Sequence, residues 1–527
     1  MKKLTIGTRG SDLALWQANF IKDKLAAIGV EAELKIIKTQ GDKILNLRLD
    51  KLEGKGFFTK ELEEELLNGS IDLAVHSHKD LPTTHPAGLI IAAVPEREDP
   101  SELLLILKDC VDVTQKLSLK TGAMVGTSSN RRKAQLLALR PDLNVEDLRG
   151  NVPTRIQKLR DENYDAILLA KAGVNRLAID LSEFHLEVID TTELVPSPAQ
   201  GALGIQIRES DQELYDVLQQ LNHQATVEEI AVERKVLNLF EGGCHMPLGC
   251  YCKKDNGQFE VWTSKAETDE DFPDRLFYRV ENLDGLAEKI VAKFKAVRNL
   301  PSKVFISREI GENNYFRRAL EKHKIEIEGR SLIRTFPIVH VLDPFYIKNI
   351  DWIFFSSRNC VEYFFKLNPV LSKRIKFGVV GRGSEDALRR WGHLSDFVGD
   401  GGEIDEVAAA FAAMVEGNRV LFPRAQDSLL SMQKYLKPGT KIVDLPIYET
   451  VIEDEIDRTS AEVLIFTSPS NVEAYFAHNL LDPEQKVIAI GHSTGKKFDE
   501  MGVKYILPYS PDEIGLAEAV FGIDVKL

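Results

Sequence analysis

The chain has 527 residues, more than one hydrophobic core usually organises, so several domains are expected. Its hydrophobic content of 43% and charged content of 28% are ordinary for a globular protein. A formal net charge of −14 argues against broad binding to nucleic acid or anionic membranes. The five cysteines are too few for a disulfide framework, and we find neither a signal peptide nor a run of eighteen apolar residues, so a cytoplasmic protein is expected.

Short apolar segments alternate with amphipathic helices in the first 216 residues. A helix is expected over residues 12–29, which end in a glycine. This alternation predicts α/β domains with mainly parallel sheets, in which ligands bind in loops at the carboxyl ends of strands. The expected strands cover residues 3–8, 32–39, 71–77, 89–95, 165–173 and 202–208.

Two further segments differ from this pattern. Residues 42–58 are polar with paired glycines, which is typical either of a mobile loop over a site or of a simple surface connection. Residues 224–300 read as a helix, a stretch of alternating strand pattern and a second helix, which predicts a small α+β domain. A linker is expected at residues 296–303.

A strand–loop–helix unit recurs after residue 303. Residues 355–365 resemble residues 466–476, and residues 380–384 resemble residues 490–494, so we expect two similar doubly wound domains. Hydroxyl and glycine residues begin the helices, where they could bind anions or merely cap the helix. The six units cover residues 304–320, 352–367, 377–392, 420–436, 463–480 and 487–502.

Lys79 and Asp80 directly follow the apolar segment 71–77. A carboxylate at this position could stabilise a cation or transfer protons, and the lysine would keep it ionised. A surface turn would have a similar sequence.

Residues 127–176 carry ten Lys and Arg against six Asp and Glu, in an otherwise acidic chain. Arg131 and Arg132 fall in the first turn of an expected helix, where a positive charge opposes the helix dipole. An anionic ligand would resolve that conflict, because a guanidinium group binds a carboxylate with two parallel hydrogen bonds. Arg149, Arg155 and Arg9 lie on further polar loops, so the sequence predicts a polycarboxylate ligand.

Cys244 follows two glycines in EGGCHMPLG and could be an exposed nucleophilic thiol. A buried, inert cysteine is one alternative. A metal site is another, because Cys244, His245, Cys250 and Cys252 lie close together, but their spacing lacks the paired C-x2-C of ordinary zinc sites. We therefore expect no metal.

Seven segments in order resemble the signature segments of hydroxymethylbilane synthase, also called porphobilinogen deaminase, over about residues 3–295. The region after residue 303 resembles uroporphyrinogen-III synthase through FTSPSNV (466–472), IGHSTG (490–495) and the two-domain repeat. The seven segments are RGSDLALWQ (9–17), GKGFFTKELE (54–63), AVHSHKDLP (74–82), GTSSNRRKAQL (126–136), LRGNVPTR (148–155), PAQGALGI (198–205) and EGGCHMPLG (241–249).

The first resemblance implies a dipyrromethane primer attached to Cys244, to which four porphobilinogen molecules add with loss of ammonia. It implies that Asp80, helped by Lys79, stabilises the cationic intermediate and moves protons. It implies cofactor contacts from Lys79, Asp80, Ser129, Arg131, Arg132 and Gly173. It implies substrate contacts from Arg9, Ser11, Lys55, Phe57, Thr127, Arg149, Arg155 and Gln200, and residues 42–58 as a mobile active-site loop.

The second resemblance implies closure of hydroxymethylbilane to uroporphyrinogen III with inversion of the last ring. Candidate contacts for its carboxylates are Ser357, Arg358, Asn359, Thr467, Ser468, Ser470, Asn471, Ser493 and Thr494, with Tyr475 as a candidate acid. We expect a monomer without nucleic-acid or membrane partners. Two alternatives stay open: a C-terminal half that only binds tetrapyrroles or is inactive, and a non-enzymatic, two-lobed anion-binding protein.

The resemblance also implies a fold and its boundaries. The deaminase part is expected to comprise two α/β domains like those of periplasmic binding proteins and a small α+β domain, at residues 1–100 plus 195–216, 101–194 and 217–296. The synthase part is expected to comprise two doubly wound α/β domains, at residues 303–335 plus 455–527 and 336–454.

Overall fold

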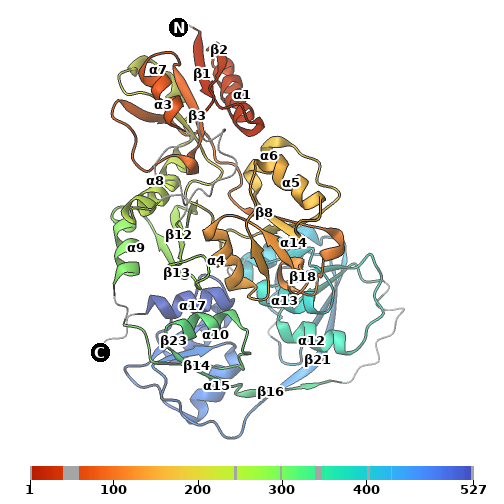
Figure 1. Cartoon of the computed structure of the whole chain (residues 1–527). Coiled ribbons are helices and arrows are strands. Elements are labelled where there is room, and N and C mark those ends of the chain that lie inside the picture. The colour runs from red at the N-terminus through yellow and green to blue at the C-terminus, as the bar shows by residue number, and fades with distance from the viewer. Residues whose placement is uncertain are drawn as a thin grey trace. The chain divides into compact units, whose positions relative to one another are not determined.

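The computed structural model describes residues 3–39, 59–242, 246–296, 299–338, 347, 349–399, 404–428 and 430–523 (Figure 1). The chain forms two compact units. The first comprises Met1–Val111 with Leu119–Val297, and the second comprises Asp112–Ser118 with Arg298–Leu527.

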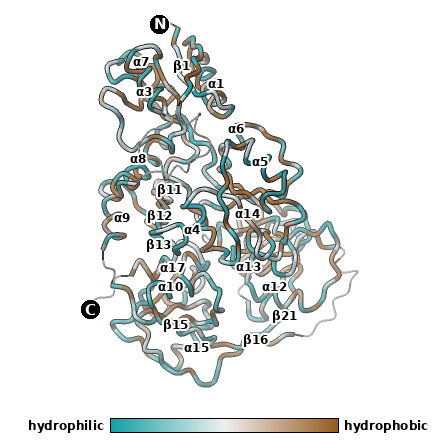
Figure 2. Tube along the Cα trace, viewed as in Figure 1, coloured by the Kyte–Doolittle hydropathy of each residue, from teal (hydrophilic) through white to brown (hydrophobic). Residues whose placement is uncertain are grey.

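The first sheet of the N-terminal unit has the strand order β2-β1-β3-β10-β4. Helix α1 (Asp12–Ala27) packs on it with Ala18, Ile21 and Leu25 buried, and α3 (Lys60–Leu67) and α7 (Gln212–Leu218) also contact it. Along α1 the hydropathy alternates, as expected of a helix with one buried face (Figure 2). The strands are β1 (Leu4–Thr8), β2 (Ala32–Ile36), β3 (Leu73–Ser77), β4 (Leu89–Ala93) and β10 (Leu203–Arg208).

The second sheet has the order β7-β6-β8-β5-β9. Its helices are α4 (Asn130–Leu139), α5 (Val152–Arg160) and α6 (Lys171–Leu177). The strands are β5 (Glu102–Ile106), β6 (Met124–Gly126), β7 (Asn144–Glu146), β8 (Ala166–Ala170) and β9 (His185–Ile189).

The expected α/β class is confirmed, and four of the five strands in each sheet of this unit run in the same direction, but one strand of each sheet runs against them. Strand β10 runs antiparallel to both β3 and β4, and β5 runs antiparallel to both β8 and β9. These two strands stand next to the crossings of the chain between the sheets. A buried strand is an apolar run in either direction, so the sequence pattern does not reveal its sense.

Two chain segments, 94–101 and 190–202, connect the sheets, and one buried carboxylate ties them together. Glu233 of α8 (Gln224–Leu239) forms an ion pair of 2.7 Å with Arg97 and accepts a hydrogen bond of 2.6 Å from the Ala199 N–H. It also accepts a hydrogen bond of 2.9 Å from the Cys252 N–H. Both crossings are therefore anchored to the same helix.

The small α+β domain is confirmed. It is an antiparallel sheet of β11 (Leu248–Asp255), β12 (Gln258–Lys265) and β13 (Asp274–Val280), covered by α8 and α9 (Leu286–Lys295). Cys250 and Cys252 are buried in its core.

The C-terminal unit contains two sheets. The first, in the order β15-β14-β22-β23, is parallel throughout, and the second has the order β16-β21-β20-β17-β18-β19 with β16 antiparallel to β21. The strands are β14 (Lys303–Ile306), β15 (Glu326–Gly329), β16 (Ile333–Pro337), β17 (Trp352–Phe355), β18 (Lys376–Val379), β19 (Phe397–Val398), β20 (Arg419–Ala425), β21 (Lys441–Ile452), β22 (Val463–Phe466) and β23 (Lys486–Ala489). The helices are α10 (Tyr315–Lys322), α12 (Arg358–Lys366), α13 (Arg382–Arg390), α14 (Ile404–Met414), α15 (Pro469–His478), α16 (His492–Met501) and α17 (Glu513–Gly522).

The expected internal repeat is present. Its first copy consists of β17–α12 followed by β18–α13, and its second copy consists of β22–α15 followed by β23–α16. The helix expected after β20 is absent from the described part of residues 426–436, where only the 3₁₀ turn η6 (Gln433–Tyr435) forms. Leu430 has φ of 54°, which interrupts a helical backbone. Strand β16 crosses the expected boundary at residue 335 and joins the second sheet.

Candidate functional site

Lys79 and Asp80 lie in a one-turn 3₁₀ helix, η2 (His78–Asp80), that directly follows β3. The Asp80 residue is exposed, whereas Lys79 is half-buried and its Nζ donates a 3.3 Å hydrogen bond to Oε1 of Gln200. The buried His78 donates its N–H to the Ala202 carbonyl at 3.0 Å. The turn is therefore held against residues 200–202, which precede β10.

Glu102, the first residue of β5, is a buried carboxylate that sequence reasoning did not identify. Its Oε1 lies 2.6 Å from Nη2 of Arg131, and its Oε2 lies 2.6 Å from Nη2 of Arg132. Gln200 donates an additional 3.0 Å hydrogen bond to Oε1. Burial would raise the pKa of Glu102, but the guanidinium groups of Arg132 and Arg131 outweigh it and lower that pKa to about 2.

This network changes the interpretation of the two arginines. The sequence alone predicts an external anion that balances their charges against the dipole of α4. In the structure, Glu102 supplies an internal anion instead. Two guanidinium groups against one carboxylate still leave one net positive charge. A charged residue at the start of the otherwise apolar strand ELLLI (102–106) was the sequence signal, because buried acids are rare unless they are paired.

Electrostatic coupling brings Asp80 together with three of the predicted basic residues. Burial lowers the pKa of Arg155 to about 10, the charge of Arg132 adds to that shift, and Asp80 opposes it. Burial also lowers the pKa of Lys79, with Asp80 opposing the shift and Arg132 adding to it. Lys79, Asp80, Arg132 and Arg155 are therefore electrostatic neighbours.

The positions of Arg149 and Arg9 follow from neighbours other than Asp80. The Nη2 of Arg149 lies 3.6 Å from Oδ2 of Asp147, and both residues precede α5. Arg9 follows β1, and burial lowers the pKa of the β3 residue His76 to about 4, with a small further contribution from Arg9.

Several predicted hydroxyl residues have structural partners. Ser11 caps α1 by accepting the Ala14 N–H at 3.4 Å, and Ser129 caps α4 by accepting the Arg132 N–H at 3.4 Å. The buried Thr127 accepts the Ser129 N–H at 3.3 Å. Gly173 lies in α6, and a side chain there would contact Val152. Capping therefore explains the two serines without requiring a ligand.

The PAQG segment needs its glycine. Gly201 has φ of +85°, and a Cβ atom there would lie 2.2 Å from the Glu98 carbonyl oxygen. The tight turn directs Gln200 between Lys79 and Glu102.

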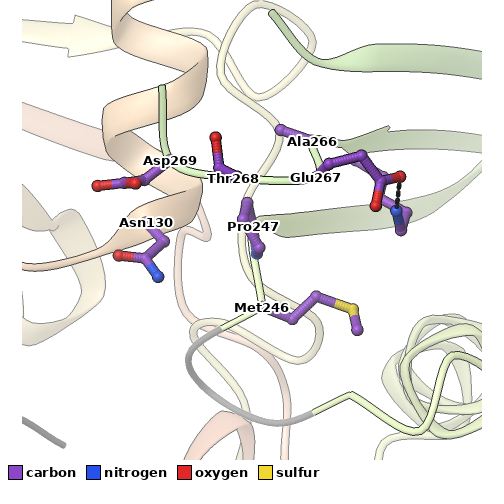
Figure 3. A pocket seen from close by; sticks show the side chains of 8 residues that line it. Asn130, Met246, Pro247, Ala266, Glu267, Thr268 and Asp269 are labelled. Atoms are coloured by element: carbon purple, nitrogen blue, oxygen red, sulfur yellow. Dashed lines mark hydrogen bonds and ion pairs between the residues drawn. The ribbon is translucent and has the colours of Figure 1, made fainter. Parts of the chain in front are cut away.

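Cys244, His245, Lys55, Phe57 and the loop 42–58 lie outside the described residues. A pocket adjoins Met246 and is lined by Asn130 at the start of α4, Pro247 and the connection from β12 to β13 (Figure 3). Lys265 and Glu267 form an ion pair of 2.5 Å beside it. Among the described residues, no cluster of three or more His, Cys, Asp or Glu could hold a metal, and no helix is long and apolar enough to cross a membrane.

In the C-terminal unit, the predicted hydroxyl residues begin helices. Ser357 caps α12 through the Cys360 N–H at 3.2 Å, and Ser468 caps α15 through the Asn471 N–H at 3.2 Å. The Thr467 hydroxyl lies 3.1 Å from that of Ser307. Ser470 is in the first turn of α15, and Thr494 is buried in that of α16.

Tyr475 is fully buried in the core of the first C-terminal sheet, with its ring centroid 5.9 Å from that of Phe305 and 5.5 Å from that of Phe466. Burial raises its pKa. The ring of Tyr475 therefore has a packing role, and a role as an acid stays a prediction.

Arginines that sequence reasoning missed accompany Arg358. Arg308 follows β14, and its Nη2 lies 2.6 Å from Oε1 of Glu513. Arg382 begins α13, and its Nη1 lies 3.3 Å from Oδ2 of Asp512. Desolvation lowers the pKa of Arg358, the charge of Arg308 adds to that shift, and Glu513 opposes it. The available signal was a recurrence: FISR (305–308), FSSR (355–358) and VVGR (379–382) each place an arginine two or three residues after the end of a strand.

We predict that Glu102→Gln lowers the free energy of unfolding by about 3–5 kcal/mol at neutral pH, because two buried guanidinium groups lose their charged partner. Since the folded pKa is depressed, the stabilisation by Glu102 is complete above its ordinary pKa of 4.5 and is lost as the pH falls through about 2. The difference between variant and wild type in urea unfolding should therefore shrink in acid. An unchanged difference at pH 7 and pH 3 would contradict this account.

Comparison with known proteins identifies both halves. Residues 4–216 match the family model described as porphobilinogen deaminase, dipyromethane cofactor binding domain, and residues 284–518 match that of uroporphyrinogen-III synthase HemD. The porphobilinogen deaminase of Maridesulfovibrio salexigens is 45% identical over 278 residues, covering 52% of this chain and 88% of the relative. That of Nitratidesulfovibrio vulgaris (strain DP4) is 51% identical over 251 residues, covering 47% of this chain and 78% of the relative.

Among solved structures, uroporphyrinogen-III synthetase from Helicobacter pylori aligns with 41% of this chain and 96% of its own, at 17% identity and a TM-score of 0.31. That likeness is too weak to add to the assignment, which rests on the family models and on the relatives. The chain therefore belongs to the porphobilinogen deaminase family in its N-terminal half and carries a uroporphyrinogen-III synthase domain in its C-terminal half.

Proposed function

We propose that this chain carries out two consecutive steps of tetrapyrrole synthesis. The N-terminal unit joins four porphobilinogen molecules into hydroxymethylbilane, with release of ammonia. The C-terminal unit closes that product into uroporphyrinogen III with inversion of the last ring. The observation that carries the first step is the hydrogen-bonded chain from Lys79, next to Asp80, through Gln200 and Glu102 to Arg132, in a chain of this family.

Asp80 is our candidate for the reacting carboxylate. Loss of ammonia from the substrate leaves a cation next to a pyrrole N–H. An exposed carboxylate at the end of a buried strand can accept that N–H, stabilise the positive charge and take up a proton from the ring carbon. Lys79, held by Gln200, places a positive charge on the residue next to Asp80.

The residues near Asp80 suit the carboxylate-rich dipyrromethane. Nε of Arg155 donates to the Gly150 carbonyl at 2.7 Å, and within the described ranges its other N–H groups remain available to acceptors of a ligand. Arg131 with Arg132 retains one net positive charge beside Glu102. When bound to Cys244, the group supplies the pyrrole carbon to which substrate is added. We propose that Lys79, Arg132 and Arg155 bind its acetates and propionates, and that Arg9 and Arg149 bind those of the incoming substrate.

In the synthase half, we propose that Arg308, Arg358 and Arg382 bind carboxylates of the linear bilane. Backbone N–H groups at the starts of α12, α13, α15 and α16 would add contacts. Asp512 and Glu513 now pair with two of these arginines, so substrate carboxylates would replace internal ones.

We also propose the boundaries of the five domains given by the resemblance, with the synthase boundary at residue 335 moved to before β16. A cytoplasmic monomer that acts on small molecules alone is consistent with the acidic, cysteine-poor composition.

Asp80→Asn should slow condensation by about 100-fold or more, because an amide cannot balance the developing positive charge. Intact mass spectrometry during turnover should show enzyme-bound intermediates accumulating. Asp23→Asn, on the exposed face of α1, is the control and should turn over normally. Normal turnover by the Asp80 variant would remove this residue from the mechanism.

Cys244→Ser should abolish primer attachment. The mass of the purified wild-type protein should exceed that of its sequence by a dipyrrole, the Ser variant should lack the increment, and Cys110→Ser should keep it. A wild-type protein without any increment would favour the anion-binding alternative, and an increment on the Ser variant would place the attachment elsewhere.

Arg308→Gln and Arg382→Gln should each raise the KM for hydroxymethylbilane about tenfold, since each removes a charge-assisted hydrogen bond. The fraction of inverted isomer made from porphobilinogen by the whole chain should fall. Arg334→Gln, which removes an exposed ion pair with Glu453, is the control. Equal isomer ratios and KM values in all three variants would rule out this carboxylate site.

A further inference from the structure

A single guanidinium group from α8 holds the backbone around Asp80. Arg234 Nη1 donates to the Leu81 carbonyl at 2.9 Å and, more weakly, to the His78 carbonyl at 3.4 Å. Its Nη2 donates to the Pro82 carbonyl at 2.5 Å. These contacts join residues more than 150 positions apart in the sequence and enclose the turn η2 at both of its ends.

The turn depends on such external donors because it has few backbone partners of its own. Within it, the Leu81 N–H donates to the His78 carbonyl at 3.3 Å, and Pro82 has no N–H to contribute. On one side, residues 200–202 hold His78 and Lys79. Arg234 supplies the hold from the side of α8, so Asp80 lies between two anchors.

His78 and His85 lie close enough to Arg234 to feel its charge, and neither imidazole competes with it as a cation. Burial lowers the pKa of His78 to about 3, and the charge of Arg234 adds to this shift. Burial and Arg234 also lower the pKa of His85. Both imidazoles are therefore neutral near pH 7, and the guanidinium faces carbonyl dipoles rather than a competing imidazolium.

The preceding residue of α8 has a second anchoring role. Glu233 binds Arg97 and the Ala199 N–H, and so fixes the two crossings between the sheets. Consecutive residues of one helix thus hold the frame of the unit and the turn that carries Asp80.

We propose that Arg234 is a positioning residue for condensation, which fixes the turn His78–Asp80 so that the Asp80 carboxylate is held at the reacting ring. This inference rests on the proposed role of Asp80. Misplacement of a reacting group by about 1 Å can cost on the order of 100-fold in rate, so loss of the clamp should be felt in the rate constant of the chemical step rather than in substrate affinity.

The test compares Arg234→Gln, Arg234→Lys and Lys235→Gln in the full chain. Lys235 is the matched control, because it is the next residue of α8 and forms an exposed ion pair with Glu288. In single-turnover reactions with porphobilinogen, Arg234→Gln should lower the condensation rate constant about 10- to 100-fold with less than about twofold change in KM. Arg234→Lys should recover part of the rate, since one ammonium cannot reach all three carbonyls. Lys235→Gln should match the wild type.

The same reactions separate positioning from loss of folded enzyme. A partly misfolded preparation lowers the reacting fraction and leaves the rate constant unchanged, whereas a displaced Asp80 lowers the rate constant itself. If Arg234→Gln does not fold, Arg234→Lys carries the test. Wild-type rate constants in the folded variants would overturn the proposal.

A double-mutant cycle with Asp80→Asn tests whether Arg234 acts through Asp80. If it does, adding Arg234→Gln to Asp80→Asn should cost less than about twofold more. Full additivity would overturn the positioning role while leaving Asp80 in place. Normal turnover by Asp80→Asn alone would instead refute the proposed function, and the two failures are thus distinguishable.

Discussion

The N-terminal unit depends on one buried carboxylate between two guanidinium groups. Glu102 opens β5, and Arg131 and Arg132 reach it from the first turn of α4. Removing either partner would leave a charge in a low-dielectric interior, which is far more costly than losing a surface ion pair. The network fixes Gln200, and Gln200 fixes Lys79, so the position of the basic groups around Asp80 follows from this internal ion pair.

Glu102 and Glu233 have similar structural roles. Each lies at a crossing between the two sheets, and each satisfies an arginine together with donors from a second segment of chain. The crossing segments lie outside the strands and therefore lack the regular backbone hydrogen bonds of a sheet. Charged side chains hold the backbone of these segments in place instead. Arg132 belongs to both groups, because it holds the frame through Glu102 and is also proposed to bind carboxylates of the cofactor.

Much of the fold could be predicted from sequence, because strands such as 71–77 and helices such as 12–29 carry strong apolar patterns. The direction of β5 and β10 could not, since burial on both faces erases the alternation that marks a strand's surroundings. Asp80 and Arg155 were singled out from their places on polar loops and received their roles from the family motifs, whereas Glu102, Arg308 and Arg382 were missed. Their roles depend on partners between 29 and 205 positions away, and periodicity carries no such information.

The place of β10 in the first sheet has a consequence for biosynthesis on the ribosome. Residues 203–208 separate β3 from β4, which are complete more than 100 residues earlier in the chain. Until β10 emerges during translation, both strands present unpaired edges, which are prone to wrong pairing. Truncated nascent chains that end before β10 should therefore be targets for chaperones, and the second sheet, whose strands span residues 102–189, can form before the first.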